Sequence, residues 1–318
     1  MILTPMQGLV YQPVPEYEDH LFAELQKIQD RLSPIGNILF HYDSDDSGTE
    51  VPVFWHRNCW LKPFRLEFDS INEAANALRG IQRNWAVLPF TQFRRAALIE
   101  SKLPPISAKP RPFPWLLGNS PVGAWTLIDK NTMIASAECS SPFPNGIIEF
   151  AQDKEGPPSR AYLKLWEALV RLRRWPKQGE RCLDSGASPG GWTWALAQLG
   201  ADVIAIDRAP LEPDISSLPN VEYIRHDAFT LKPEDIGPID WLFCDVACYP
   251  PRLYQWIEKW LESGLCGNFV CTIKMQGNTG GAGNTGDLDF ETPRRFAAIP
   301  GGEVVHLYHN KHELTWLK

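Results

Sequence analysis

The sequence predicts an α/β protein in which a doubly wound parallel sheet forms the second half and a smaller α+β region forms the first. Three observations support this. Apolar strand-like segments alternate with helical segments after about residue 150, a glycine-rich turn follows the first such strand, and acidic residues follow the next three. The 318 residues are enough for two domains. We therefore expect an auxiliary domain over residues 1–150 and a doubly wound domain over residues 151–318.

Composition and charge are those of an ordinary globular protein. Hydrophobic residues make up 44% and charged residues 22% of the chain, which excludes wholesale disorder. No apolar run reaches the ~18 residues of a membrane span, and the first residues lack the basic region of a secretory signal. The 7 cysteines form no C-x-x-C pair, which favours reduced thiols, no metal site and a cytoplasmic location. A net charge of −7 argues against coating nucleic acid by bulk charge, but it allows a local basic surface.

The first half is rich in proline and tryptophan and is predicted to mix short helices with short strands. The hydrophobic spacing predicts helices over Glu16–Leu32, Ser70–Leu78 and Phe93–Ser101, strands over Asn37–Tyr42 and Phe64–Phe68, and a hairpin over Ala124–Glu138. A proline-rich stretch, Leu103–Pro114, is typical of an extended connector. This half is therefore expected to be α+β.

The second half begins after Gly156–Ser159 and alternates strand with helix. The expected elements are strands over Cys182–Asp184, Val203–Ile206, Val221–Arg225, Ile239–Cys244 and Asn268–Ile273, and helices over Arg160–Trp175, Trp192–Leu199, Pro251–Glu262 and Pro293–Ala298. The last two segments, Glu303–Tyr308 and Glu313–Leu317, predict an antiparallel hairpin at the edge of the sheet.

The turn after the first strand is a candidate nucleotide-binding loop. Glycines allow a ligand to approach the backbone, and the helix that follows offers unpaired N–H groups. The turn does not read G-x-G-x-x-G, and an acid stands where a pyrophosphate would be repelled. An acid there suits a cationic ligand with an amino group, such as the methionine part of S-adenosylmethionine. The candidate cofactor-binding residues of the turn are Asp184, Gly186, Ser188, Pro189, Gly190, Gly191 and Trp192.

Three further acids follow the carboxyl ends of the next strands. Asp207 ends the second strand, where a carboxylate can accept from both ribose hydroxyls. Asp227 follows the third strand and is a candidate acceptor from an adenine amino group. Asp245 follows the fourth strand. Because the carboxyl ends of parallel strands meet at one edge, the sequence predicts an S-adenosyl-L-methionine site there.

Several segments resemble one known family, the FtsJ-like (RrmJ-type) ribose 2'-O-methyltransferases. Asp184–Trp192 resembles motif I of this family, and the remaining similar segments follow in order over residues 140–318. The similarity is greatest to the RlmM-like branch, which acts on a cytidine of large-subunit ribosomal RNA. Upstream, the resemblance is limited to a THUMP-like RNA-binding region. The matching segments besides motif I are Ser141–Gly146, Pro158–Ala168, Asp240–Asp245, Trp260–Cys266 and Leu307–Thr315.

The resemblance implies a Rossmann-like fold, S-adenosyl-L-methionine as cofactor, an RNA substrate and a Lys-Asp-Lys-Glu tetrad. Carried over residue by residue, the tetrad is Lys164, Asp245, Lys274 and Glu313. Lys274 is the candidate base, but a lysine can act so only if burial or a like charge lowers its pKa. Lys164 would lower that pKa, whereas the two carboxylates would raise it. The alternative is that Lys274 orients the ribose hydroxyl.

Two basic clusters are candidate RNA contacts. The first comprises Arg171, Arg173 and Arg174, with Lys177, just after the first helix of the second half. The second lies in the first half and comprises Arg94, Arg95, Lys102, Lys109 and Arg111. A solvated surface is the alternative reading of each cluster. Two clusters on an acidic chain favour a restricted RNA path.

The sequence departs from the family pattern at three places. Ala161 replaces a serine that usually approaches the cofactor, and Ser188 replaces a cysteine or alanine. A glycine-rich stretch over residues 277–286 stands where the family is lysine-rich, and it is a mobile lid or a changed substrate site. Two alternative functions stay open: methylation of a small hydroxylated substrate, and a non-catalytic RNA-binding paralogue.

Overall fold

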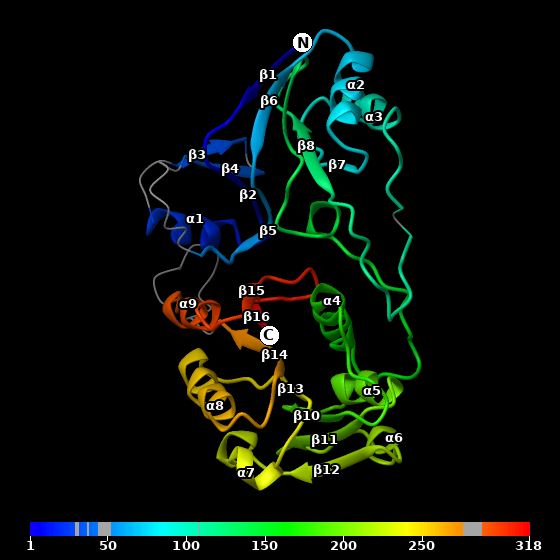
Figure 1. Cartoon of the computed structure of the whole chain (residues 1–318), viewed down its shortest axis with the longest axis vertical. Coiled ribbons are helices and arrows are strands. Elements are labelled where there is room, and N and C mark those ends of the chain that lie inside the picture. Colours follow the sequence, from blue (N-terminus) through cyan, green and yellow to red (C-terminus); the bar gives the residue numbers. More distant parts are fainter. Residues whose placement is uncertain (29–31, 37, 44–51, 108, 276–287) are drawn as a thin grey trace. The chain divides into compact units, whose positions relative to one another are not determined.

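The computed structural model describes residues 1–28, 32–36, 38–43, 52–107, 109–275 and 288–318. The chain divides into two compact units (Figure 1). The first comprises Met1–Pro110 and Leu117–Glu149, and the second comprises Arg111–Leu116 and Phe150–Lys318. Arg111–Leu116, which begins in the stretch expected from the sequence to be an extended connector, packs with the second unit. Its Arg111 bridges to Phe150, and Phe113 stacks on Trp166 at 4.9 Å between ring centroids.

A seven-stranded sheet forms the centre of the second unit, in the order β12-β11-β10-β13-β14-β16-β15. The first five of these strands are parallel to one another, and the last two are antiparallel additions at one edge. The strands are β10 (Arg181–Ser185), β11 (Asp202–Asp207), β12 (Val221–Arg225), β13 (Trp241–Cys244), β14 (Asn268–Lys274), β15 (Glu303–Val305) and β16 (Glu313–Leu317).

Helices cover both faces of this sheet, which explains why its central strands have no polar alternation. Figure 1 shows α4 and α5 on one face and α8 and α9 on the other. The helices of the unit are α4 (Tyr162–Leu172), α5 (Gly191–Gln198), α6 (Pro213–Ser216), α7 (Pro233–Ile236), α8 (Pro250–Ser263) and α9 (Glu291–Ala297), and Ala228–Thr230 forms a short 3₁₀ turn. The predicted α/β class of this half is confirmed.

The strand order reverses between β10 and β13, because β11 and β12 lie on one side of β10 and β13 lies on the other. In doubly wound sheets, ligands bind outside the carboxyl ends of the strands at such a reversal. The glycine-rich turn follows β10 at this point, and Gly186 has a φ of +80°. A Cβ on Gly186 would lie 2.8 Å from Cγ2 of Val246, so the turn needs glycine there.

The described residues of the first unit form two sheets. A five-stranded sheet has the order β1-β6-β9-β8-β7, and a four-stranded antiparallel sheet has the order β3-β4-β2-β5. The strands are β1 (Ile2–Pro5), β2 (Leu9–Pro13), β3 (Leu32–Ile35), β4 (Leu39–Tyr42), β5 (His56–Trp60), β6 (Pro63–Glu67), β7 (Trp85–Val87), β8 (Gly123–Leu127) and β9 (Thr132–Ser136). The helices are α1 (Glu18–Gln26), α2 (Ile71–Ile81) and α3 (Phe93–Glu100), and Pro144–Gly146 forms a 3₁₀ turn.

Several predicted elements of the first unit match the structure, and others do not. Ser70 caps α2 by accepting from the N–H of Glu73, and β8 and β9 form the expected hairpin. The helix expected over Glu16–Leu32 ends at Gln26, and Leu32 begins a strand instead. Five strands (β1, β2, β3, β5 and β7) were not predicted, because short strands without regular alternation give no periodic signal. The α+β class holds, whereas its THUMP-like character stays a prediction.

Within the described residues, no helix is both long and apolar enough to cross a membrane. The cytoplasmic location stays a prediction. The glycine-rich stretch over residues 277–286, expected as a lid or a changed substrate site, lies outside the described residues.

Candidate active site

Helix α4 carries Lys164 to the carboxyl edge of the sheet. Residues 162–170 of this helix are buried on every side, so Lys164 is a buried cation that is only 6% exposed. Its Nζ lies 5.8 Å from the centre of the Trp192 ring. The indole of Trp192 donates to the carbonyl of Ala161, at the start of the same helix, at 2.9 Å. Trp192 therefore holds α4 and faces the Lys164 ammonium with its aromatic ring.

Strand order and register bring together the other three residues of the predicted tetrad. Asp245 follows β13 directly, and Lys274 ends the neighbouring parallel strand β14. Glu313 begins β16, which runs antiparallel to β14, and it pairs directly with Lys274 in the register. Side chains opposite each other on adjacent strands lie about 5 Å apart at Cβ, so this pairing places Lys274 beside Glu313.

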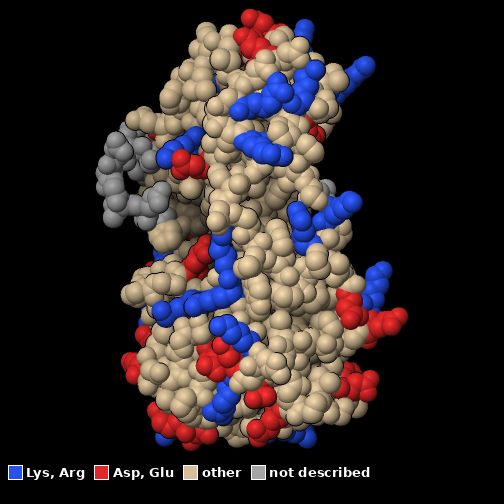
Figure 2. Space-filling model, turned by 45° about the vertical axis from the view of Figure 1, so that its right-hand side comes forward, with Lys and Arg blue, Asp and Glu red and all other residues tan. Residues whose placement is uncertain are grey.

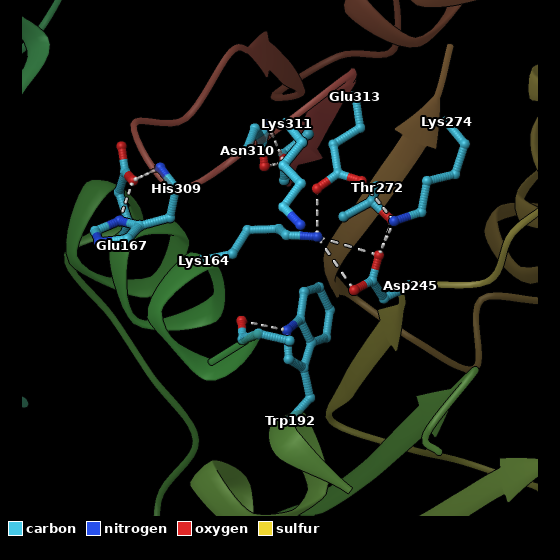
Figure 3. A network of polar contacts seen from close by, with 12 residues as sticks. Lys164, Glu167, Trp192, Asp245, Thr272, Lys274, His309, Asn310, Lys311 and Glu313 are labelled. Atoms are coloured by element: carbon cyan, nitrogen blue, oxygen red, sulfur yellow. Dashed lines mark hydrogen bonds and ion pairs between the residues drawn. The ribbon is translucent and has the colours of Figure 1, made fainter. Parts of the chain in front are cut away.

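The four side chains form a closed ring of alternating charge (Figure 3). Lys164 Nζ lies 3.1 Å from Oδ2 of Asp245 and 2.6 Å from Oε1 of Glu313. Lys274 Nζ lies 2.5 Å from Oδ1 of Asp245 and 2.5 Å from Oε2 of Glu313. Each ammonium thus contacts both carboxylates. Lys164 and Glu313 are buried and Asp245 and Lys274 are half-buried, and the two cations and two anions compensate one another, which is the condition for withdrawing charge from water.

The charges of this ring set the pKa values of its members. Burial alone would raise the pKa of Asp245, but Lys164 and Lys274 outweigh it and lower that pKa. The same two lysines lower the pKa of Glu313 against the effect of burial. Burial alone would lower the pKa of Lys274, yet Asp245 and Glu313 raise it well above its ordinary value. The raised pKa favours the ammonium form of Lys274 at neutral pH, which agrees with the alternative that this residue orients the ribose hydroxyl rather than acting as a base.

A cavity of about 290 Å³ opens at the same edge of the sheet, beside Asp245. Its lining contains three carboxylates, from Asp207, Asp227 and Asp245, together with the ring of Phe229. Five of the ten predicted cofactor-binding residues line it: Gly186, Ser188, Asp207, Asp227 and Asp245. Asp245 therefore belongs both to the cavity and to the charged ring.

Two of the lining carboxylates already hold backbone groups in place. Asp207 accepts from the N–H groups of Ser188, at 3.0 Å, and Ala209, at 2.8 Å, which ties the glycine-rich turn to β11. Asp227 accepts from the N–H of Phe229 at 3.1 Å and pairs with Arg252 at 3.3 Å. A carboxylate can accept about four hydrogen bonds, so both retain acceptor capacity for a ligand.

The other five predicted cofactor-binding residues do not line the cavity: Asp184, Pro189, Gly190, Gly191 and Trp192. Pro189, Gly190 and Gly191 shape the turn and begin α5, and Trp192 supports Lys164. Asp184 is fully buried, and Oδ2 of its carboxylate accepts from the hydroxyl of Thr193 at 2.6 Å. Its hydrogen bond in this structure is thus made inside the domain, and its expected contact with a ligand amino group stays a prediction.

Sequence reasoning missed several residues of this site. Thr272 donates to Oδ1 of Asp245 at 2.6 Å, and Arg252 and Phe229 line the cavity. The guanidinium of Arg252 lies 4.6 Å from the centre of the Phe229 ring. Phe229 is two residues after Asp227, and Thr272 is two residues before Lys274. Closeness in sequence to a predicted site residue could therefore have identified both. Arg252 lies in α8, 25 residues after Asp227, and only the fold brings the two together.

The expected RNA-contacting arginines are placed unequally. The side chain of Arg171 is 7% exposed and faces Glu167, so it does not belong to an exposed cluster. Arg173 and Arg174 are exposed at the end of α4. Arg94 is exposed on α3, whereas Arg95 lies over the ring of Phe68 and donates to Asn131. Arg94, Arg173 and Arg174 are thus the exposed members of this set, and the guanidinium of Arg174 also lies 5.5 Å from the centre of the Trp241 ring.

Basic side chains also gather over helices α2 and α3 of the first unit. On the face drawn in Figure 2, Lys and Arg predominate over this region, whereas the second unit mixes both signs. The exposed basic residues of these two helices and the segments after them are Arg79, Arg83, Arg94, Lys102 and Lys109. No group of His, Cys, Asp and Glu suited to a metal ion occurs among the described residues.

Comparisons with known proteins agree with the geometry of this site. The model of the FtsJ-like methyltransferase family matches residues 157–281. The chain is 33% identical over 185 residues to "Ribosomal RNA large subunit methyltransferase M" of Azoarcus sp. strain BH72, covering 55% of this chain and 49% of the relative. The protein of the same name from Halorhodospira halophila is 35% identical over 181 residues, covering 54% of this chain and 50% of the relative.

A third relative extends the match into the first unit. "Ribosomal RNA large subunit methyltransferase M" of Xanthomonas axonopodis pv. citri is 30% identical over 254 residues, covering 77% of this chain and 69% of the relative. The first two matches, by contrast, span about half the length of those relatives.

Proposed function

Because the chain belongs to the FtsJ-like methyltransferase family, in the branch of the ribosomal RNA large subunit methyltransferase M proteins, we propose that it methylates a ribose 2'-hydroxyl of ribosomal RNA. The methyl donor is S-adenosyl-L-methionine. The observation that carries the proposal is the shared position of Asp245, which lines the cavity and also belongs to the Lys164–Asp245–Lys274–Glu313 ring.

The residues of the cavity fit the cofactor. Its sulfonium and amino groups are cationic, and three carboxylates line the cavity. Asp207 suits the ribose hydroxyls because it ends β11, and Asp227 suits the adenine amino group beside Phe229. The cofactor supplies a methyl group that its own positive charge activates. The main task of the protein is then to align the ribose hydroxyl with that methyl.

The charged ring performs this alignment. Lys274 is an ammonium and can donate to the 2'-oxygen, which orients a lone pair toward the methyl carbon. Lys164 lies against the Trp192 ring and contacts both carboxylates. It therefore fixes the positions of Asp245 and Glu313 from the side of the charged ring opposite Lys274. As the bond from oxygen to carbon forms and the bond from carbon to sulfur breaks, the sulfur keeps the electron pair. The hydroxyl then becomes strongly acidic, so an ionised carboxylate such as Asp245 suffices to accept its proton.

The RNA is held by phosphate contacts from exposed arginines. Arg173 and Arg174 lie at the end of the helix that carries Lys164, and Arg94 lies on the basic surface over α2 and α3 of the first unit. Phosphate contacts of this kind position a nucleic acid without reading its sequence. Ribose chemistry also needs a nucleotide that is accessible outside a helix.

The direct test is transfer of a labelled methyl group from S-adenosyl-L-methionine to ribosomal RNA, followed by mass mapping of the methylated nucleosides. We expect a 2'-O-methylated nucleoside and a transfer rate that falls steeply as salt rises, because phosphate contacts release counterions. A base-methylated nucleoside would contradict the ribose assignment. Salt-independent turnover of a small hydroxylated compound would favour the small-substrate alternative, and a lack of cofactor binding in calorimetry would favour a non-catalytic protein.

Replacing the exposed arginines tests the RNA path. Arg173→Ala and Arg174→Ala should each weaken RNA binding a few-fold and reduce the slope of log affinity against log salt by about one. Arg171→Ala should leave that slope unchanged, because this side chain is buried against Glu167. An equal loss of slope in all three variants would contradict the assignment of Arg171 to the interior.

A further inference from the structure

Glu167 is a buried acid that the proposed reaction does not use. It is on α4, three residues after Lys164, and it is fully buried. A buried carboxylate is costly unless it is paired and hydrogen-bonded. The contacts that compensate it therefore show what the residue does.

All of these contacts join α4 to one segment or stay on α4. Oε1 of Glu167 accepts from the backbone N–H of Tyr308 at 2.9 Å, and Oε2 accepts from the N–H of His309 at 3.1 Å. The Nδ1 atom of the His309 ring lies 2.9 Å from Oε2 (Figure 3). Arg171, one turn further along the helix, lies 3.7 Å from Oε1.

These contacts keep the carboxylate ionised. Burial alone would raise the pKa of Glu167, but the hydrogen bond from His309 and the charge of Arg171 outweigh it and lower that pKa. An ionised acceptor bonds backbone N–H groups about twice as strongly as a neutral one. The carboxylate thus fastens residues 308 and 309 to α4.

The fastened segment leads directly to the charged ring. His309 is four residues before Glu313, which begins β16 and meets both lysines. Lys164 and Glu167 are neighbours on one helix, because residues three apart lie on the same face. One rigid element therefore carries a member of the ring and also holds the segment that delivers another member.

We propose that Glu167 is a positioning residue, which sets where Glu313 meets Lys164 and Lys274 by holding residues 308 and 309 against α4. The kinetic part of this proposal rests on the proposed methyltransferase function. The geometric part does not, since it concerns only where Glu313 lies in the folded chain. A displacement of about 1 Å at a reacting centre can cost 10²-fold in rate.

The test is Glu167→Gln in the full chain. An amide presents an NH₂ group in place of one of the two carboxylate oxygens, so a donor would face the backbone N–H of either Tyr308 or His309, and that hydrogen bond would be lost. We expect kcat to fall between about tenfold and 10²-fold. The dissociation constant for S-adenosyl-L-methionine should stay within about twofold, because Glu167 does not line the cavity. The control is Glu258→Gln, which removes a partly exposed charge 3.6 Å from Arg295 on the same unit and should change neither value.

A second readout does not depend on activity. Acetylation of lysines by acetic anhydride at pH 9, followed by mass spectrometry, reports how much of each amine is neutral. Asp245 and Glu313 keep Lys274 protonated. If Glu313 moves away, each unit by which the pKa of Lys274 falls should raise its labelling rate about tenfold. We expect Lys274 to be labelled at least about tenfold faster in Glu167→Gln than in the wild type, and at the wild-type rate in Glu258→Gln.

The outcomes separate the two proposals. Faster labelling of Lys274 supports the positioning role even if no methyl transfer is found in the wild-type chain. A folded Glu167→Gln protein with wild-type kcat and wild-type labelling would overturn it. Should this variant not fold, His309→Ala removes one of the three hydrogen bonds and leaves the two backbone contacts. It should change both readouts about threefold, and wild-type values would again overturn the proposal.

Discussion

Asp184 and Asp245 belong to neighbouring parallel strands at the same edge of the sheet, yet their ionisation is shifted in opposite directions. Burial raises the pKa of Asp184 to about 7. Burial would also raise the pKa of Asp245, but Lys164 and Lys274 lower it below its ordinary value. The two carboxylates thus differ in charge state near neutral pH, although both are largely withdrawn from water.

Their partners explain the difference. Asp184 receives one hydroxyl, from Thr193, and its Oδ1 has no hydrogen-bond partner among the described residues. Asp245 contacts two ammonium groups and the hydroxyl of Thr272. Sequence position at a strand end therefore does not decide the charge of an acid. The charge state of the carboxyl group depends on which cations lie beside it in the folded protein.

The largest expected effect comes from removing a cation of the ring. Lys274→Ala should lower methyl transfer at least 10³-fold, since the 2'-oxygen loses its donor and Asp245 loses a partner. Calorimetry should show nearly unchanged affinity for S-adenosyl-L-methionine, because Lys274 does not line the cavity.

Lys259→Ala, at an exposed position on α8, is the matched control and should retain both activities. Loss of transfer and cofactor binding together in Lys274→Ala would mean that the ring and the cavity are not separable. The difference in ionisation between Asp184 and Asp245 would then have no consequence for function.

An intermediate effect is expected from removing the charge of Asp184. The pKa of Asp184 is higher in the folded state than in the unfolded state. Its contribution to the free energy of unfolding is therefore complete below the unfolded-state pKa, near 3.8, and is lost as the pH rises from there through about 7. Asp184→Asn has no such loss, so it should be more stable than the wild type at pH 8 by about 4 kcal/mol, because the two pKa values differ by about three units and each unit is worth about 1.4 kcal/mol. Urea unfolding of both proteins between pH 4 and pH 8 measures this difference.

The difference should shrink to less than about 1 kcal/mol near pH 4, where the carboxyl is protonated in the folded state and close to its own pKa in the unfolded state. Asp202→Asn changes an exposed acid at the start of β11 and should show no such dependence. A stability difference for Asp184→Asn that does not vary with pH would contradict a raised pKa at this position.

The smallest effect is expected at Thr272. Thr272→Val keeps the shape of the side chain but removes the hydroxyl that donates to Asp245 at 2.6 Å. We expect kcat to fall about tenfold, a typical cost for a lost charge-assisted hydrogen bond. The pKa of Asp245 should rise, so activity on the acidic side should be lost at a higher pH than in the wild type. A pH profile of kcat measures both changes.

Thr126→Val, in β8 of the first unit, is the control, because its hydroxyl donates to a backbone carbonyl, that of Leu88, rather than to a carboxylate. It should leave the pH profile unchanged. An acidic limb in Thr272→Val that coincides with the wild type would show that this hydroxyl does not help to keep Asp245 ionised.

The sequence was most informative where its periodicity was strong. The alternation of apolar strands and helices in the second half predicted its parallel strands and the antiparallel strands β15 and β16 at the edge. It was least informative for β1 and β3 of the first half, which are four residues long and carry no regular alternation. The resemblance to the family singled out Lys164 and Glu313, which are far apart in sequence and meet in the structure at 2.6 Å.

What the sequence determined by itself was the strands and longer helices of the second half and the residue types at their ends, because hydrophobic spacing and turn chemistry are local properties. Three matters were decided only by tertiary structure: that Asp184 faces Thr193 rather than the cavity, that Lys274 stays protonated, and that Glu167 fastens the segment before Glu313. Each depends on which groups meet across the sheet, and on the balance between burial and neighbouring charge. That balance has no local signature, since the competing terms come from residues distant in the chain.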